Sequence, residues 1–218
     1  MKKRLICGII WSMLVCPHFV FSQEYRIEAG LGYNIQRVGL SADLQGRSGY
    51  SDNQSYNSIL SQFGVEYELS KRFDLAASAR YTNSKENDSF SESSIDYDNK
   101  SRLTFDLGYN AKRYDNQIKF KNRLRYQVNI NEGGIQKSYF REKVTFDYKL
   151  SDLLSPYAAI EVYYHLQKQE LSAYRIYLGS EIEMGKHKVD CFFINEISHK
   201  NSFELFYILG IAYKFKTD

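Results

Sequence analysis

The sequence is poor in cysteine and in proline. Only one of the three cysteines, Cys191, lies after residue 22, so a chain that begins there has no intramolecular disulfide. The two prolines are Pro17 and Pro156, and this scarcity suits extended strands because proline interrupts the hydrogen-bonded ladder of a sheet. Stability must therefore come from packing and from backbone hydrogen bonds rather than from cross-links.

Long apolar runs and excess charge are also missing. Residues 23–218 contain no run of the ~20 apolar residues that a transmembrane helix needs, which excludes a helical membrane protein. Three of the 29 basic residues lie at positions 2–4, and without them 26 basic residues stand against 26 acidic ones. A chain without net charge argues against a nucleic-acid partner.

Residues 1–22 have the composition of a secretory signal peptide. The cations at residues 2–4 give a positive start, Leu5–Val15 is mainly apolar, and Val20–Ser22 precedes a cleavage site. The apolar run is too short for a transmembrane anchor, and Pro17 follows it closely. We therefore predict a cleaved signal peptide over residues 1–22 and a mature chain over residues 23–218.

Aromatic residues are abundant and recur with a period of two. The 19 tyrosines and 14 phenylalanines favour strands. From Asn201 to Phe215, an apolar side chain occupies every second position, and successive side chains of a strand point to opposite faces. Eleven alternating segments of this kind occur. Each is long enough to cross a bilayer as a tilted strand, which takes ~9–11 residues.

This pattern predicts an all-β fold, an antiparallel transmembrane up-and-down β-barrel in one domain. Bacterial single-chain barrels normally have an even number of strands. We therefore expect ten strands, with Tyr25–Leu44 as one long bulged strand and both termini in the periplasm, or twelve strands as the alternative. Polar loops are expected at residues 45–56, 83–100 and 129–137. A secreted soluble β-sandwich is the structural alternative, since it uses similar strands.

Charged residues occupy the strand face opposite the apolar stripe. An Arg or Lys at the bilayer midplane costs ~2–4 kcal/mol, so this face should point into the lumen. It includes Glu66, Glu68, Arg80, Asp106 and Glu196. Opposite charges there should pair. We predict a lumenal charge network that holds and plugs the barrel, formed by Arg123, Arg125, Arg141, Glu161, Arg175 and Glu181. A candidate anion path continues along the same basic strand at Lys119 and Lys121.

Two sets of residues resemble known proteins. The run Gly210-x-x-Tyr213-x-Phe215 resembles the C-terminal signal by which Gram-negative outer-membrane barrels are recognised for assembly. A second set resembles the outer-membrane barrel family catalogued as domain of unknown function 2490: Arg123–Arg125, Arg141, Pro156–Glu161, Tyr174–Gly179 and Ile208–Gly210. The resemblance implies a protein of the Gram-negative outer membrane, whose partners are outer-membrane lipid and the barrel assembly machinery. It implies no assigned activity.

No catalytic or metal-binding motif with a specific spacing occurs, so we expect no cofactor and no metal. The one pair that could serve catalysis is His165 with Ser172, provided that both lie near the same barrel end. That pair would suit a lipid-modifying acyl hydrolase. We expect instead a non-enzymatic envelope barrel, either structural or a narrow solute pore, and keep the hydrolase as the alternative.

Overall fold

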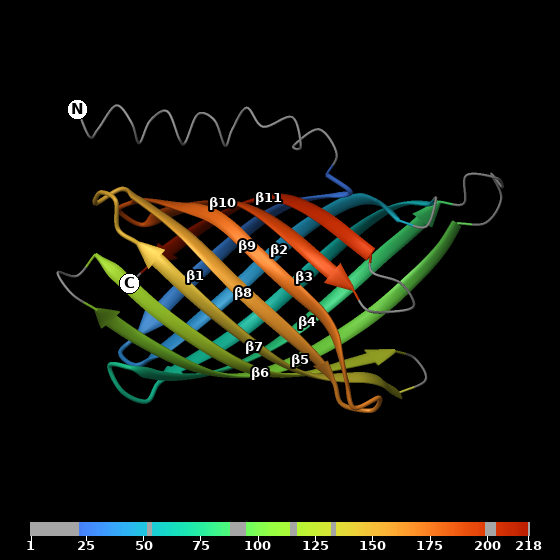
Figure 1. Ribbon diagram of the computed structural model, residues 1–218, viewed down its shortest axis with the longest axis horizontal. Helices are drawn as coiled ribbons and strands as arrows, with labels where there is room; N and C mark the ends of the chain where they lie inside the picture. The colour runs from blue at the N-terminus through green and yellow to red at the C-terminus, as the bar shows by residue number, and fades with distance from the viewer. Residues whose placement is uncertain are drawn as a thin grey trace.

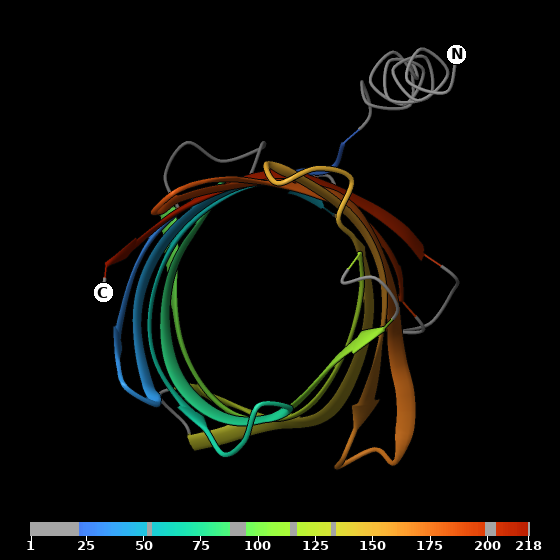
Figure 2. The same ribbon diagram turned by 90° about the vertical axis from the view of Figure 1, so that its left-hand side faces the viewer.

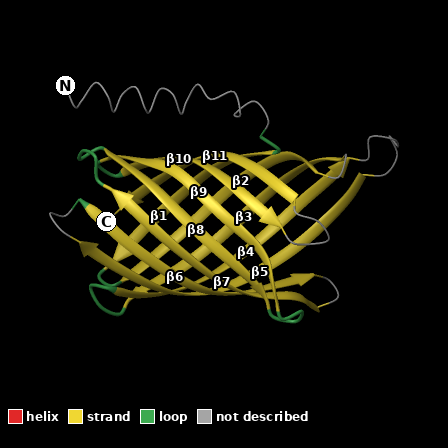
Figure 3. Ribbon diagram, viewed as in Figure 1, coloured by secondary structure: helices red, strands yellow, loops and turns green. Residues whose placement is uncertain are grey.

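The computed structural model describes residues 22–51, 54–87, 95–113, 117–131, 134–198 and 204–217. The predicted signal peptide lies outside the described residues except for Ser22. Every regular element in these ranges is a strand (Figure 3). The strands are β1 (Glu24–Ile35), β2 (Val38–Ser51), β3 (Gln54–Glu68), β4 (Phe73–Asn87), β5 (Ile95–Arg113), β6 (Ile118–Asn131), β7 (Gly134–Tyr148), β8 (Leu154–His165), β9 (Glu170–Met184), β10 (His187–Ser198) and β11 (Glu204–Thr217) (Figure 1). Across the same ranges, no helix is long and apolar enough to cross a membrane.

The strands form one closed barrel, which Figure 2 shows end on. Each strand pairs antiparallel with the next one along the chain, and β1 closes the ring by running parallel to β11. The closing register extends from Glu24 opposite Ile208 to Tyr33 opposite Thr217. A closed sheet leaves no edge strand unpaired. It also excludes the β-sandwich, because a sandwich needs two packed sheets.

The predicted all-β barrel is confirmed, but both predicted strand numbers are wrong, because the described chain forms eleven strands. The segment Tyr25–Leu44 is a hairpin: the chain turns at Gln36 and Arg37, and Tyr33 stands opposite Leu40. Gln36 has a positive φ of 53°, as two-residue hairpin turns require. An up-and-down barrel with an odd strand number closes through one parallel pair. The barrel therefore begins at one rim and ends at the other. The prediction that both ends lie on the same side is wrong.

The strands extend further than the polarity of their ends predicts. Most residues of the predicted loops at 45–56 and 129–137 belong to strands. In the loop predicted at 83–100, only residues 88–94 lie outside β4 and β5. Polar side chains do not stop a backbone ladder, so the strands pair on beyond the apolar positions. Strand lengths run from 12 residues in β1 to 19 residues in β5.

Large apolar side chains cover the outside of the barrel. Ile27, Phe63 and Ile135 are 72%, 65% and 70% exposed. Similar exposed apolar side chains occur on every strand from β1 to β9 and on β11. Among the buried polar residues are Gln45, Arg141 and Glu161, which occupy the inward phase of their strands. The distribution is the inverse of that in a soluble domain, where charged residues are mostly exposed.

The charge of Glu142 departs from the predicted pattern. Glu142 of β7 occupies the outward phase, between the inward residues Arg141 and Lys143, and is exposed. Asn122 of β6 donates to it, with Nδ2 2.8 Å from Oε1. The prediction that strand charges keep to the inner face is therefore wrong at Glu142, where an amide from the neighbouring strand satisfies the carboxylate.

An apolar cluster fills part of the lumen against β8 to β11. Its core is a row of four residues that stand opposite one another on these strands: Ala159, Tyr177, Ile194 and Ile208. Tyr157, Phe192 and Phe206 pack against this row. Ile208 is only 1% exposed, so this side of the interior is closed by side chains.

Candidate functional site: the charged lumen

The strands β6 to β9 bring the central charges together. Inward residues alternate along each strand, so the pairing register decides which of them meet. Glu161 of β8 stands opposite Lys143 of β7 and Arg175 of β9. Arg123 of β6 also stands opposite Lys143. To reach Glu161, the long side chain of Arg123 therefore passes over one intervening strand.

The carboxylate of Glu161 is the centre of this network. Its side chain is 0% exposed and accepts four hydrogen bonds. Oε1 lies 3.0 Å from Nη2 of Arg123 and 2.8 Å from Nη2 of Arg141. Oε2 accepts from the hydroxyls of Tyr163 at 3.1 Å and of Tyr177 at 2.5 Å. Charge-assisted bonds are the strong ones, so this carboxylate braces four neighbouring strands.

Two tyrosine rings hold the surrounding cations. The guanidinium of Arg141 lies 4.2 Å from the centroid of the Tyr163 ring, and that of Arg175 lies 4.8 Å from the same centroid. Nζ of Lys143 lies 3.7 Å from the centroid of the Tyr177 ring. Cations are attracted to aromatic faces at such distances. The tyrosines thus accept cations on their rings while their hydroxyls donate to Glu161.

Further ion pairs surround this centre and join other strands. Nε and Nη2 of Arg125 lie 2.7 Å and 2.5 Å from the two carboxylate oxygens of Asp106. Nζ of Lys121 lies 2.8 Å from Oδ2 of Asp147. Nζ of Lys214 lies 3.5 Å from Oε1 of Glu28 and 3.4 Å from Oδ1 of Asp43, which ties β11 to β1 and β2.

The predicted network is only partly one cluster. The structure brings Arg123, Arg141 and Glu161 into direct contact. Arg125, Arg175 and Glu181 form ion pairs with other residues, which are Asp106, Glu196 and Lys188. Register is the cause for Arg125, which stands opposite Asp106. Arg175 stands opposite both Glu161 and Glu196, and its ion pair is with Glu196.

The candidate anion path is also divided. Lys121 is engaged with Asp147, whereas Lys119 faces the lumen and stands opposite Asp147 in the register. Both lie near the rim where β6 begins. Carboxylates are frequent at this rim and include Glu66, Glu68, Asp74, Glu181, Glu183 and Asp190. These two lysines therefore do not form a separate positive surface.

A second group of cations was not predicted as a site. Arg26, Arg47 and Arg102, together with Arg80, face the lumen in the half near the first residues of β1. Arg26 stands opposite Arg47, and Arg80 stands opposite Arg102. Each occupies the polar phase of its strand, and that signal is present in the sequence. The meeting of like charges depends on register, which the sequence does not state.

His165 and Ser172 form bonds to the backbone near the β8–β9 turn. Nδ1 of His165 accepts the N–H of Lys168 at 3.1 Å, and the hydroxyl of Ser172 donates to the carbonyl of Tyr163 at 3.3 Å. In the described structure, no hydrogen bond joins the two side chains. The ranges described also contain no group of three His, Cys, Asp or Glu residues that could hold a metal ion.

The residues of the predicted assembly signal lie on both faces of β11. Tyr213 and Phe215 point outward, and the hydroxyl of Tyr213 lies 2.7 Å from Nδ1 of His187. Gly210 faces the lumen beneath Phe192, and a Cβ at this position would overlap the Phe192 ring. Glycine is therefore required here by the close approach of an aromatic ring.

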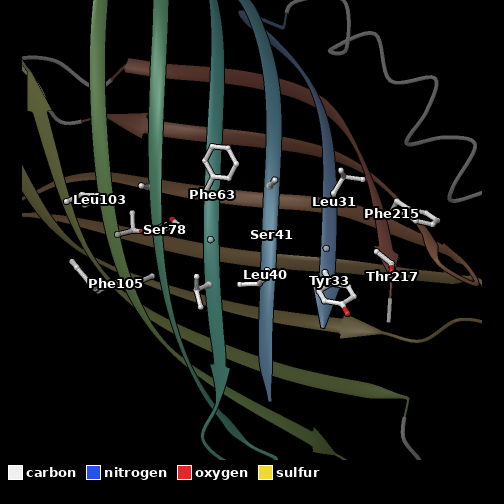
Figure 4. Close-up of a pocket in the computed structure, with 17 residues that line it drawn as sticks. Leu31, Tyr33, Leu40, Ser41, Phe63, Ser78, Leu103, Phe105, Phe215 and Thr217 are labelled. Atoms are coloured by element: carbon white, nitrogen blue, oxygen red, sulfur yellow. Dashed lines mark hydrogen bonds between the residues drawn. The ribbon is translucent and has the colours of Figure 1, made fainter. Parts of the chain in front are cut away.

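An apolar depression of about 930 Å³ lies on the outer surface over β1 to β5 and the end of β11 (Figure 4). Large side chains, including Leu31, Tyr33 and Phe63, stand around small residues such as Ala42 and Ala77. None of the residues that line it is charged. Its chemistry matches hydrocarbon rather than a polar substrate.

The fold and the lumen together define a closed β-barrel that is apolar outside and cross-braced by ion pairs inside. The sequence matches the family described as protein of unknown function (DUF2490) over residues 22–207, and the chain belongs to this family. The match confirms the resemblance inferred from the residues around Arg123, Glu161 and Arg175. No curated protein matches the sequence.

Proposed function

We propose that the protein is an integral β-barrel of the outer membrane of a Gram-negative bacterium and that it acts without catalysis. One observation carries this proposal: large apolar side chains such as Ile27 are exposed, whereas Glu161 and Arg141 are buried. Apolar surface is unfavourable in water and favourable against lipid tails. Outer-membrane lipid is therefore the proposed partner of the outer surface, including the depression over β1 to β5.

The contacts inside the barrel support a structural role for the lumen. Glu161 joins β6, β7 and β9 to its own strand, and the pair of Arg125 with Asp106 joins β5 to β6. Lys214 of β11 joins this last strand to β1 and β2, across the closure of the barrel. We infer that these braces hold the barrel together and narrow the passage through it.

The last strand supports a second proposed partner, the barrel assembly machinery. The side chains of Tyr213 and Phe215 lie on the outer face at the end of β11, and Tyr213 is 39% exposed. An assembly factor could therefore contact these aromatic residues before β11 pairs with β1.

Membrane fractionation of the native protein tests the location. We expect it to stay with the outer-membrane pellet in alkaline carbonate, to require detergent for release, and to begin at Gln23 by mass spectrometry. We also expect the folded barrel to migrate differently on a gel before and after heating. A protein that is released by carbonate, or that keeps Met1, would contradict the proposal.

A further inference from the structure

Six arginines converge in the half of the lumen near the first residues of β1. They are Arg26, Arg47, Arg80, Arg102, Arg141 and Arg175. Three of them bind carboxylates, since Arg26 pairs with Glu24, Arg141 with Glu161 and Arg175 with Glu196. We call the other three the arginine triad: Arg47, Arg80 and Arg102.

Among the described residues, the side chains of the arginine triad donate hydrogen bonds to neutral partners only. Nε of Arg47 donates to Gln45 at 2.6 Å, Nε of Arg80 to Gln62 at 2.8 Å, and Nε of Arg102 to Asn129 at 2.9 Å. Each bond uses Nε and leaves the terminal nitrogens of the guanidinium group without a protein acceptor among the described residues. Three charged forks therefore remain available in the lumen.

The three cations lie close enough to repel one another. Each is within electrostatic range of the other two, and Arg47 of β2 is also within range of Arg175 on β9. Three strands of the ring lie between β2 and β9 on the shorter side, so the side chains of Arg47 and Arg175 approach one another across the interior. Like charges that stand opposite one another in a sheet are destabilising.

Nearby carboxylates are already engaged. Glu24 is bound by Arg26 and by the hydroxyl of Tyr56. Glu28 accepts from Nε2 of Gln45 at 2.7 Å and lies 3.5 Å from Nζ of Lys214. Among the described residues, these acids therefore leave part of the positive charge of the arginine triad uncompensated.

We propose that the arginine triad binds a multivalent oxyanion, such as phosphate or a phosphate group on a soluble solute, inside the lumen. Guanidinium groups match the oxygen geometry of phosphate and bind it through paired N–H donors. Gln45, Gln62 and Asn129 orient the three side chains by accepting from Nε, which leaves the terminal donors for the ligand. The inference rests on the barrel geometry and adds a ligand class to the proposed function. It does not depend on where the barrel resides.

Calorimetric titration of the purified mature barrel in detergent tests the proposal. Inorganic phosphate, sulfate and chloride are titrated at equal ionic strength, and a detergent-dispersed anionic phospholipid is titrated separately. We expect binding of phosphate and sulfate, and none of chloride or of the lipid. Each neutralised arginine should weaken phosphate affinity about tenfold, the factor expected for a lost charged hydrogen bond. The variants are Arg47→Gln, Arg80→Gln, Arg102→Gln and their combination. The control that keeps binding is Lys149→Gln, because Lys149 pairs with Asp152 in the turn between β7 and β8.

Thermal stability provides a second measurement. If the arginines were purely structural, their substitution would lower the midpoint of unfolding, whereas the proposal predicts that it rises. Without phosphate, Arg80→Gln should raise the midpoint of thermal unfolding by about 2–4 °C because it relieves repulsion. With phosphate, the native barrel should gain stability and the triple variant should not. Equal phosphate binding by the native and triple variants, no binding by the native barrel, or an equal response to chloride would overturn the proposal. Absence of phosphate binding would leave the carbonate test of membrane location unaffected.

Discussion

At the scale of single residues, one carboxylate connects a third of the barrel wall. Glu161 is completely buried and receives donors from Arg123, Arg141, Tyr163 and Tyr177. A buried ion pair is weak evidence for net stability when it is compared with apolar packing. Removing one partner is a different matter, because the remaining charges then lose their counterion.

We expect Glu161→Gln to lower the free energy of unfolding by about 3 kcal/mol or more, the usual cost of breaking a buried pair from one side. The amide keeps the size of the side chain but leaves Arg123 and Arg141 without a shared anion. The temperature at which the heat-dependent gel mobility changes measures the effect. The matched control is Glu183→Gln at the rim, where Nζ of Lys188 is 4.0 Å away and the carboxylate is half exposed. A Glu161→Gln barrel as stable as this control would count against the central brace.

At the scale of strands, close approach between inner side chains fixes how β8, β9 and β10 fit together. Gly179 of β9 stands between Tyr157 and Phe192 in the register. The hydroxyl of Tyr157 donates to Oδ2 of Asp190 at 3.2 Å, which fixes its ring over the glycine. The missing side chain at position 179 is thus part of how the strands pack.

We expect Gly179→Ala to destabilise the barrel by about 1–3 kcal/mol, the typical cost of overpacking. A Cβ at this position would lie 2.5 Å from Cζ of Tyr157, so the ring must shift and its bond to Asp190 must weaken. Urea unfolding in detergent measures the change. Gly46→Ala is the control, since a Cβ there has nothing within 4 Å, and its effect should stay within about 0.5 kcal/mol. Equal effects of the two substitutions would contradict this account.

At the scale of the whole molecule, the odd strand number decides how the barrel closes. The strands β1 and β11 run side by side in the same direction (Figure 1), and Ile27 stands opposite Ile211 on the outer face. Neighbouring strands are ~4.8 Å apart, within the ~4.4–6.8 Å between Cα atoms that a disulfide spans. A disulfide can therefore cross-link β1 to β11.

We expect Ile27→Cys with Ile211→Cys to form an intramolecular disulfide under mild oxidation. Cys191 also stands opposite Ile211, so it is first replaced by Ser. Gel mobility without reductant and peptide mass spectrometry detect the bond. The control combines Ile27→Cys with Leu205→Cys, which lies six residues away from Ile211 along the same strand face and should not cross-link. Efficient bonding in the control, or none in the matched pair, would refute the parallel closure.

The class of this protein could be predicted from the sequence because its main signal is local. Side chains alternate between the two faces of any strand, so a period of two in apolarity separates an outer face from a lumen before the strands are arranged. For the same reason Arg123, Arg141 and Glu161 could be assigned to the interior from the sequence alone. The recurrence of such segments along the chain also indicated one barrel domain.

Only the tertiary structure decided the strand number, the register and the partners of each charge. The hairpin at Gln36 adds one strand, and that single turn changes the closure from antiparallel to parallel. Register then pairs Arg125 with Asp106 instead of Glu161, and it helps to gather the arginine triad from positions that are far apart in the sequence. The physical reason is that alternation depends on neighbours in the chain, whereas pairing across a closed sheet depends on every turn and on the ring as a whole.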